Sequence, residues 1–344
     1  MVAAQAAIPA AAQQPPARAN RVQLRFDTTE AAVALGLVEA KLQKYELTTD
    51  DWRALFNSDG YKRLKLREAD LQRAFTDTSF MEFILSDTLG RRAVALRAAL
   101  EKWERADVRG AAARALAYLP ADARIAATVY IVIKPKTNTF VYDVDRDPAI
   151  FVYLDPTATP AQLENTVAHE LHHIGFSSIG SRTYAMIAPL ADSARGAAEW
   201  VAAFGEGFAM LAAAGGPDIH PHAKSASADR ARWNSDMTHF NRDLKVVETF
   251  FLDILNRRFT TPDALSRAAM EFYGVQGPWY TVGWKMASTI ERRFGRAELI
   301  ECMADPHRLL DRYNAAATEY NRKNPAGTLA LWAPGLVAAF KRPG

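Results

Sequence analysis

Cysteine is nearly absent from this sequence of 344 residues, in which Cys302 stands alone. A single cysteine cannot form an intramolecular disulfide, and a zinc site built on cysteine needs several thiolates. Cys302 lies in the apolar stretch 299–303, where we expect it to be a small buried hydrophobe rather than a nucleophile. Neither a disulfide framework nor a cysteine metal site is therefore expected.

The sequence also lacks a large charge of one sign and a long apolar run. The net charge is +3, from 42 basic and 39 acidic residues, and no basic stripe with interleaved aromatics stands out. Nucleic acid is therefore not an expected partner. No apolar run reaches the roughly 18–20 residues that a transmembrane helix needs. A composition of 49% hydrophobic and 24% charged residues is typical of a globular protein.

The first residues lack the basic n-region of an intact signal peptide. They are mostly Ala, Gln and Pro, so we expect a disordered tail over residues 1–22. Such a tail is typical of a chain whose export signal has been removed, and we favour an exported protein, periplasmic or secreted. An ordinary terminus of a cytoplasmic protein is the alternative. The sequence does not indicate an oligomeric state.

The pattern of apolar residues predicts a helix-dominant α+β protein. Residues 23–123 form an N-terminal helical region, and 124–344 form the core. Three short strands are expected at 128–133, 138–143 and 149–154, and their short connections favour a small, mainly antiparallel sheet. A helix follows, with Thr159 as its N-cap and Pro160 as its first residue, and further helices are expected at 193–214, 227–257 and 279–294.

The strongest chemical signal is the segment 169–173, His-Glu-Leu-His-His. On a helix, residues four apart share a face, so His169 and His173 can offer two imidazole nitrogens to one ion. Glu170 lies near the same rim and can act on a water without being a ligand. Imidazole and carboxylate ligands suit zinc, although manganese or cobalt could occupy such a site in vitro. His172 points about 100° away from His173, so we expect it beside the site or partly exposed.

A third ligand should come from the next helix, and Glu206 is the candidate that we favour. It follows His173 with room for a loop and a returning helix, and Gly205 and Gly207 on both sides allow two helices to approach closely. Glu199 is the rival. Because the two glutamates are separated by two helical turns, about 11 Å, they cannot both bind one ion. Glu199 would then be solvated or contact substrate.

The segments 169–173 and 205–209, Gly-Glu-Gly-Phe-Ala, together resemble the gluzincin metallopeptidases. The Glu-Gly-Phe-Ala run is similar to the aminopeptidase N type, and the whole layout resembles uncharacterised bacterial zinc-dependent peptidases with a zincin-like core. In these enzymes the glutamate of the second helix binds the single zinc ion. The segment 280–283, Tyr-Thr-Val-Gly, resembles their Tyr-x-x-Gly segment, which implies that Tyr280 assists at the tetrahedral intermediate. Tyr273 is the alternative.

Upstream, the segments 138–142 and 151–155 resemble the edge strand and its neighbour in thermolysin-like enzymes. There the edge strand pairs with extended substrate, which implies substrate binding around Asn138 and Tyr142. Two departures matter. No Gly-x-Met-Glu-Asn segment is present to bind a free substrate amine, and Thr139 stands where thermolysin-like enzymes carry alanine. The choice between endopeptidase and exopeptidase therefore stays open.

These residues predict the hydrolysis of peptide bonds by a metal-activated water, with Glu170 as general base and Tyr280 as a donor to the oxyanion. The expected partner is a peptide or protein substrate. Two alternatives remain at this stage: a catalytically silent binding protein with a structural zinc, and a metal-dependent hydrolase of a non-peptide amide.

Overall fold

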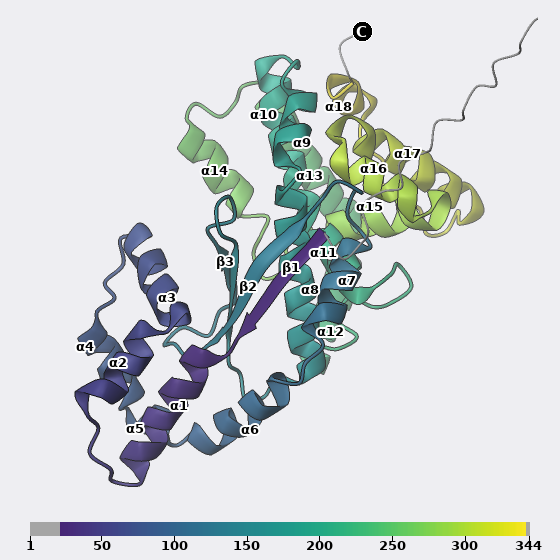
Figure 1. Cartoon of the computed structure of the whole chain (residues 1–344). Coiled ribbons are helices and arrows are strands. Elements are labelled where there is room, and N and C mark those ends of the chain that lie inside the picture. The colour runs from purple at the N-terminus through teal and green to yellow at the C-terminus, as the bar shows by residue number, and fades with distance from the viewer. Residues whose placement is uncertain (1–20, 342–344) are drawn as a thin grey trace, which may run out of the picture.

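The computed structural model describes residues 21–341, in which helices surround one small sheet (Figure 1). The strands are β1 (Val22–Asp27), β2 (Ile125–Val132), β3 (Phe140–Tyr142) and β4 (Ala149–Tyr153). The helices before the second strand are α1 (Thr29–Leu42), α2 (Thr49–Asn57), α3 (Asp59–Asp70), α4 (Asp77–Ile84), α5 (Asp87–Gly90), α6 (Ala93–Trp103) and α7 (Val108–Leu116).

After β4 the described chain consists of helices joined by loops, with no further strand. These elements are α8 (Pro160–Ser177), α9 (Gly180–Ile187), α10 (Asp192–Val201), the 3-10 turn η2 (Ala202–Phe204), α11 (Gly205–Ala214), α12 (Ser227–Met237), α13 (Phe240–Leu255), α14 (Pro262–Met270), α15 (Pro278–Phe294), α16 (Arg296–Ala304), α17 (Pro306–Lys323) and α18 (Pro334–Ala339). The helix-dominant α+β class is therefore confirmed.

The sheet is mixed, and the prediction of a mainly antiparallel sheet is wrong. The strand order is β1-β2-β4-β3, in which β1 pairs with β2 and β2 with β4 in parallel, while β3 pairs antiparallel with β4. A parallel pair needs a crossover of about a dozen residues or more. The segment 133–148 supplies it, because the chain passes to the far edge as β3 and returns through a turn into β4. Strand β1 was not predicted.

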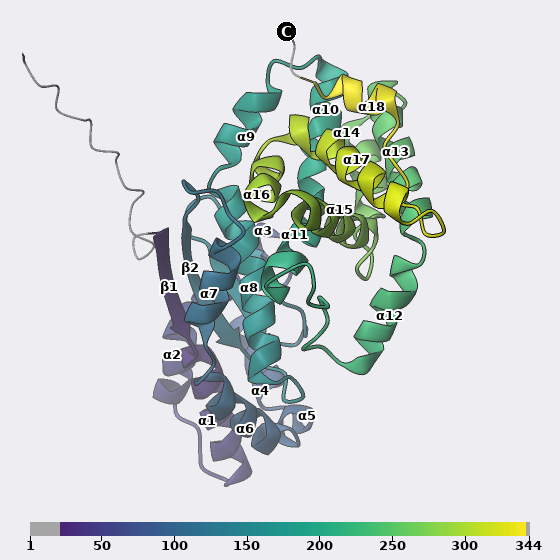
Figure 2. The same cartoon turned by 90° about the vertical axis from the view of Figure 1, so that its right-hand side faces the viewer.

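Both faces of the sheet are covered. Alternate residues of β2 and β4 point to opposite faces. Val129, Ile131 and Val152 belong to the core that includes α1, α7 and α8, whereas Tyr130 and Phe151 pack with Leu64 of α3 on the other face. Figure 2 shows the sheet nearly edge-on, with α7 and α8 along it and the C-terminal helices beyond.

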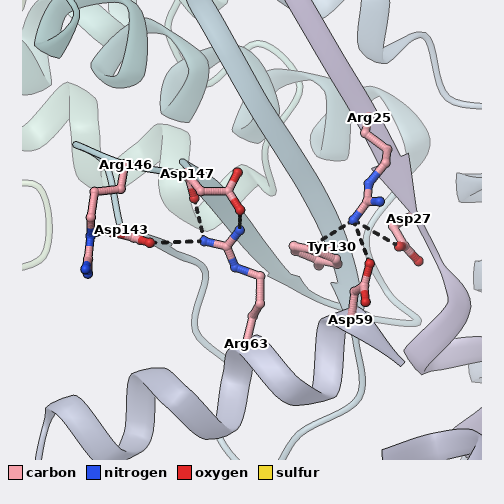
Figure 3. A network of polar contacts seen from close by, with 8 residues as sticks. All are labelled: Arg25, Asp27, Asp59, Arg63, Tyr130, Asp143, Arg146 and Asp147. Atoms are coloured by element: carbon pink, nitrogen blue, oxygen red, sulfur yellow. Dashed lines mark hydrogen bonds and ion pairs between the residues drawn. The ribbon is translucent and has the colours of Figure 1, made fainter. Parts of the chain in front are cut away.

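Helix α3 also fastens the turn that carries the edge strand. The guanidinium of Arg63 bonds to Asp147 and lies 3.7 Å from Asp143, at the two ends of the turn between β3 and β4 (Figure 3). Nearby, Arg25 of β1 donates to the Tyr130 hydroxyl at 2.9 Å. The contacts of Arg63 hold the turn that joins β3, the strand expected to bind substrate, to β4.

Two expected helices are interrupted, and the tail lies largely outside the described residues. The helix expected at 193–214 is divided into α10 and α11 by η2, and the helix expected at 227–257 is divided into α12 and α13. Thr159 is confirmed as the N-cap of α8, where its side chain and that of Gln162 form a capping box. Of the expected tail over residues 1–22, the structure describes Arg21 and Val22.

The apolar side chains form two large cores. One core joins the N-terminal helices, the sheet and most of α8, and the other joins the helices from α9 onward. Phe176, near the end of α8, packs against both. Helix α8 therefore lies where the two cores meet. Among residues 21–341, no helix combines the length and the apolar character needed to cross a membrane.

We predict that Glu30 makes stability depend on pH. Its side chain is buried, Oε2 accepts from the Ile133 amide at 2.8 Å, and burial raises its pKa to about 8. In the unfolded chain the pKa is about 4.5. Because the folded state holds the proton more tightly, the free energy of unfolding should fall as pH rises from about 4.5 to about 8.

Glu30→Gln should remove this loss, because the amide oxygen still accepts from Ile133 and no longer ionises. Urea unfolding at pH 5 and pH 8 should show the variant gaining a few kcal/mol over the wild type between the two values, at about 1.4 kcal/mol per pKa unit. Glu46→Gln, at an exposed loop position, serves as the control. If wild type and Glu30→Gln change in parallel with pH, Glu30 does not carry the effect.

Candidate metal centre

His169, Glu170 and His173 lie on one side of α8, and the other side of this helix is firmly packed. Its opposite side is apolar, with Val167 and Leu171 fully buried. Gly175 permits close packing, because a Cβ atom there would lie 2.2 Å from Cδ1 of Leu119. The sheet side of the molecule thus holds α8 tightly, and the half-buried face that carries the motif is directed to the C-terminal helices.

Glu206 lies in the first turn of α11, which packs against both α8 and α15. The contact with α15 is made backbone to backbone. A Cβ atom on Gly207 would lie 2.0 Å from the Trp284 amide nitrogen, and one on Gly283 would lie 2.7 Å from the Phe204 carbonyl oxygen. A Cβ atom on Gly205 would meet nothing within 4 Å. Of the two glycines beside Glu206, Gly207 is therefore the one that close approach requires.

The side chains of His169, His173 and Glu206 converge on one point. Nε2 of His169 lies 3.1 Å from Nε2 of His173, and both nitrogens lie 3.2 Å from Oε2 of Glu206. Within the part of the chain that the structure describes, these three residues form a group whose donor atoms could hold a metal ion. Their side chains are 14%, 28% and 18% exposed, so the group is accessible from one side.

The donor triangle fits zinc. Zinc bonds to histidine nitrogen and carboxylate oxygen are about 2.0–2.2 Å long, so the ligands of a tetrahedral ion lie about 3.3–3.5 Å apart. The observed separations of 3.1–3.2 Å are within a few tenths of an ångström of that spacing. Three protein ligands leave a fourth position for water or substrate, as in catalytic rather than structural zinc sites.

The charges at the site are strongly coupled. Burial alone would raise the pKa of Glu206, but the hydrogen bonds to His169 and His173, together with the charges of these two histidines, outweigh burial and lower that pKa far below its ordinary value. Burial alone would lower the pKa of His173, but the hydrogen bond to Glu206 and the charges of Glu206 and Glu170 together outweigh burial and raise it. Glu206 is therefore ionised at neutral pH, which is the form that binds a cation.

Tyr280, at the start of α15, lies against this triangle. Its ring stacks on the ring of His169, with centroids 6.3 Å apart and planes 9° apart. Burial, the charge of Glu206 and a hydrogen bond to Glu206 raise the pKa of Tyr280 well above the ordinary value, so its hydroxyl keeps its proton. The pKa of Tyr273 is also raised, first by burial and then by the charge of Glu206.

Glu170 lies beside the same residues without being committed to any of them. Its charge contributes to the raised pKa of His173 and to that of Tyr280. Among the described residues it makes no side-chain hydrogen bond or ion pair. The carboxylate is half-buried and free to accept a hydrogen bond from a bound water or substrate.

His172 and Glu199 both lie outside the group of donor residues. His172 is 1% exposed, so it is not a partly exposed residue, and burial lowers its pKa to about 3. It therefore stays neutral, and it is not part of the metal-binding group. Glu199 is exposed on α10, which η2 separates from the helix of Glu206. It is not part of the metal-binding group.

The two residues expected to bind substrate lie at the edge of the sheet. Asn138 precedes β3, and its Oδ1 accepts from Nζ of Lys134 at 2.8 Å. The hydroxyl of Tyr142 donates to Asp70 of α3 at 2.5 Å. Neither side chain contacts the donor triangle in the hydrogen-bonding network of the described residues. Strand β3 is, however, the outermost strand of the sheet beyond β4.

Fold and site together define a class of protein: a helix-dominant chain with a small mixed sheet, in which two histidines of one helix and a glutamate of a later helix could hold a metal ion. A family model matches residues 52–322, which includes every residue of the site, and is described as "Putative zinc dependent peptidase (DUF5700)". The chain belongs to this family. No curated protein and no solved structure matches the chain.

We predict that the contact between α11 and α15 tolerates no side chain at Gly207. Gly207→Ala should destabilise the protein by about 1–3 kcal/mol, because a Cβ atom would overlap the Trp284 backbone. It should also weaken zinc binding, because α11 carries Glu206. Gly205→Ala, two residues away and in open space, should be neutral or slightly stabilising. Urea unfolding and zinc titration test both variants, and equal behaviour of the two would contradict the prediction.

We also predict that the metal content follows the donor triangle. The purified protein should bind one zinc ion per chain, as measured by elemental analysis after dialysis. His169→Ala and Glu206→Gln should each weaken binding by more than the roughly 10–100-fold that changes around a ligand cost. Glu199→Gln should leave binding unchanged. Retention of tight binding by Glu206→Gln would remove this residue from the ligand set.

Proposed function

We propose that this protein is a gluzincin-type zinc peptidase with a zincin-like core. His169, His173 and Glu206 hold one zinc ion, Glu170 is the general base, and Tyr280 is the donor to the developing oxyanion. The observation that carries the proposal is the convergence of the three donor side chains from α8 and α11, with the ring of Tyr280 of α15 stacked on that of His169. Glu170 follows His169 directly on α8.

The ligand set supports a catalytic ion. When bound there, zinc acts as a Lewis acid that polarises a carbonyl oxygen and lowers the pKa of a coordinated water toward about 7. Two neutral imidazoles and one carboxylate leave the site a net positive charge in the presence of a divalent ion. That charge favours the negative charge that develops on a peptide carbonyl oxygen during hydrolysis.

Glu170 is suited to move protons because it has no other partner. Its carboxylate accepts a proton from the attacking water and delivers it to the amine that leaves. Glu170 directly follows His169 on α8, so the proposed base lies next to a proposed ligand.

Tyr280 is suited to donate a hydrogen bond. Because its pKa is raised well above the ordinary value, the hydroxyl remains protonated at neutral pH and above. We expect this hydroxyl to turn from Glu206 toward the substrate carbonyl oxygen when the substrate and zinc are bound. Tyr273 lies near enough to Glu206 to serve in this role if Tyr280 does not.

The edge strand β3 supports binding of an extended peptide. Its outer edge is not paired with another described strand, and backbone groups there can add a substrate as a further strand. The contacts of Tyr142 with Asp70 and of Asn138 with Lys134 hold the two ends of β3 in place. In this role Asn138 and Tyr142 position the strand, and its backbone binds the peptide.

We predict that Glu170→Gln abolishes peptide hydrolysis while zinc remains bound. The amide cannot accept the proton, and the ligand set is untouched, so kcat should fall by about a hundredfold or more. Tyr280→Phe should lower kcat by roughly the same order with a smaller change in KM, because its bond forms as charge develops. Cleavage of a quenched fluorescent peptide library, with and without chelator, measures both.

Tyr320→Phe, on the exposed side of α17, is the matched control for the loss of a hydroxyl. Normal turnover by Glu170→Gln would overturn the proposed mechanism. The absence of chelator-sensitive cleavage from the wild-type, zinc-loaded protein would instead favour a binding protein with a structural zinc. Cleavage of small amides alone would favour the hydrolase of non-peptide amides.

A further inference from the structure

A small apolar cavity continues the interface that holds the metal site. Helices α8 and α11 meet at His173 and Glu206. One turn further along α8 lie Phe176 and Ser177, and one turn before Glu206 lies Ala202 in η2. These three residues line a cavity of about 200 Å³. The cavity therefore lies next to the donor residues, about one helical turn from them along the same interface.

An exposed lining residue of this cavity lies on the same side of α8 as the proposed general base. Residues seven apart on a helix share a face, so exposed Ser177 lies on the same side of α8 as Glu170. The separation along the helix axis is about 10 Å, the length of roughly three residues of extended peptide. A peptide whose scissile bond lies at Glu170 can thus place a nearby side chain in the cavity.

The walls of the cavity are apolar. Ile187 of α9, Phe208 of α11 and Leu309 of α17 are among the buried side chains that line it. Its volume is below the roughly 300–1,000 Å³ of pockets that enclose a whole small molecule. The size and the walls suit a single side chain with a hydrocarbon stem.

One charged residue lines the cavity, and it is Glu199. Its carboxylate is exposed and makes no ion pair or hydrogen bond among the described residues. Arg195, one turn earlier on α10, is paired with Asp192 at 2.7 Å rather than with Glu199. A negative charge without a partner therefore stands at the mouth of an apolar cavity.

We propose that this cavity is a specificity site for a lysine or arginine side chain of the substrate, with Glu199 binding the cation. Apolar walls cover the methylene stem of a basic side chain, and a carboxylate at the solvent end pairs with its charged head. An acidic side chain is repelled by Glu199. An uncharged apolar side chain fills the walls but leaves the carboxylate without a partner. The inference rests on the proposed peptidase function.

Cleavage preference tests the proposal. The zinc-loaded protein is given an equimolar library of unstructured peptides, and the products are sequenced by mass spectrometry. Lysine and arginine should be enriched at one fixed position within about three residues of the cleaved bond. Two peptides that differ by lysine or norleucine at that position, which have the same stem with and without the charge, then give kcat/KM values.

Glu199→Gln should lower kcat/KM for the lysine peptide about five- to tenfold, as expected for loss of a partly exposed ion pair, and change the norleucine value less than twofold. Glu199→Lys should favour a glutamate peptide over the lysine peptide. Glu82→Gln, an exposed glutamate on α4 far along the chain, should change neither value. Equal effects of Glu199→Gln on both peptides, or cleavage without enrichment of basic residues, would overturn the proposal.

A binding measurement separates this inference from the proposed function. The Glu170→Gln protein is titrated with fluorescently labelled lysine, norleucine and glutamate peptides, and the lysine peptide should bind most tightly. If the wild-type protein cleaves peptides without basic preference and the titration shows none, the inference fails and the peptidase stands. If lysine peptides bind selectively and no peptide is cleaved, the peptidase fails and the cavity stands.

Discussion

The site depends on close contact between three helices. Donor atoms of a zinc site must lie within a few tenths of an ångström of their places, and a helix displaced by one side chain would separate them by far more. Gly207 and Gly283 remove the side chains between α11 and α15, and Gly175 lets α8 settle against Leu119. Gly207 and Gly283 thus permit the close approach of α11, which carries Glu206, and α15, which carries Tyr280.

The two cores give the site both rigidity and access. The sheet and N-terminal helices hold the apolar side of α8, and the C-terminal helices supply Glu206 and Tyr280 from the other core. Because the site lies where the cores meet, its donors are only partly covered and remain partly accessible to solvent. The cavity beside Glu199 begins at Phe176, which packs against both cores, and its buried apolar walls belong to the second core.

Part of the fold was readable from local signals, and part was not. Thr159 and Pro160 marked the start of α8, and β-branched runs marked β2 and β4, because capping and strand propensity act over a few residues. The direction of pairing was misread from the short connections. The uninterrupted apolar runs of β2 and β4 were the better signal, because strands buried on both faces are typical of parallel pairing. Strand β1 is paired with a segment about a hundred residues away, which no local pattern indicates.

The sequence by itself determined the chemistry of the candidate site: His169 and His173 one helical turn apart, Glu170 between them, and a glutamate flanked by glycines on a later helix. This follows because helical periodicity sets which side chains share a face. Tertiary structure decided the rest. It brought Glu206 rather than Glu199 to the histidines, set Tyr280 against His169, buried His172 and left Glu199 beside a cavity, because each of these depends on how separate helices pack.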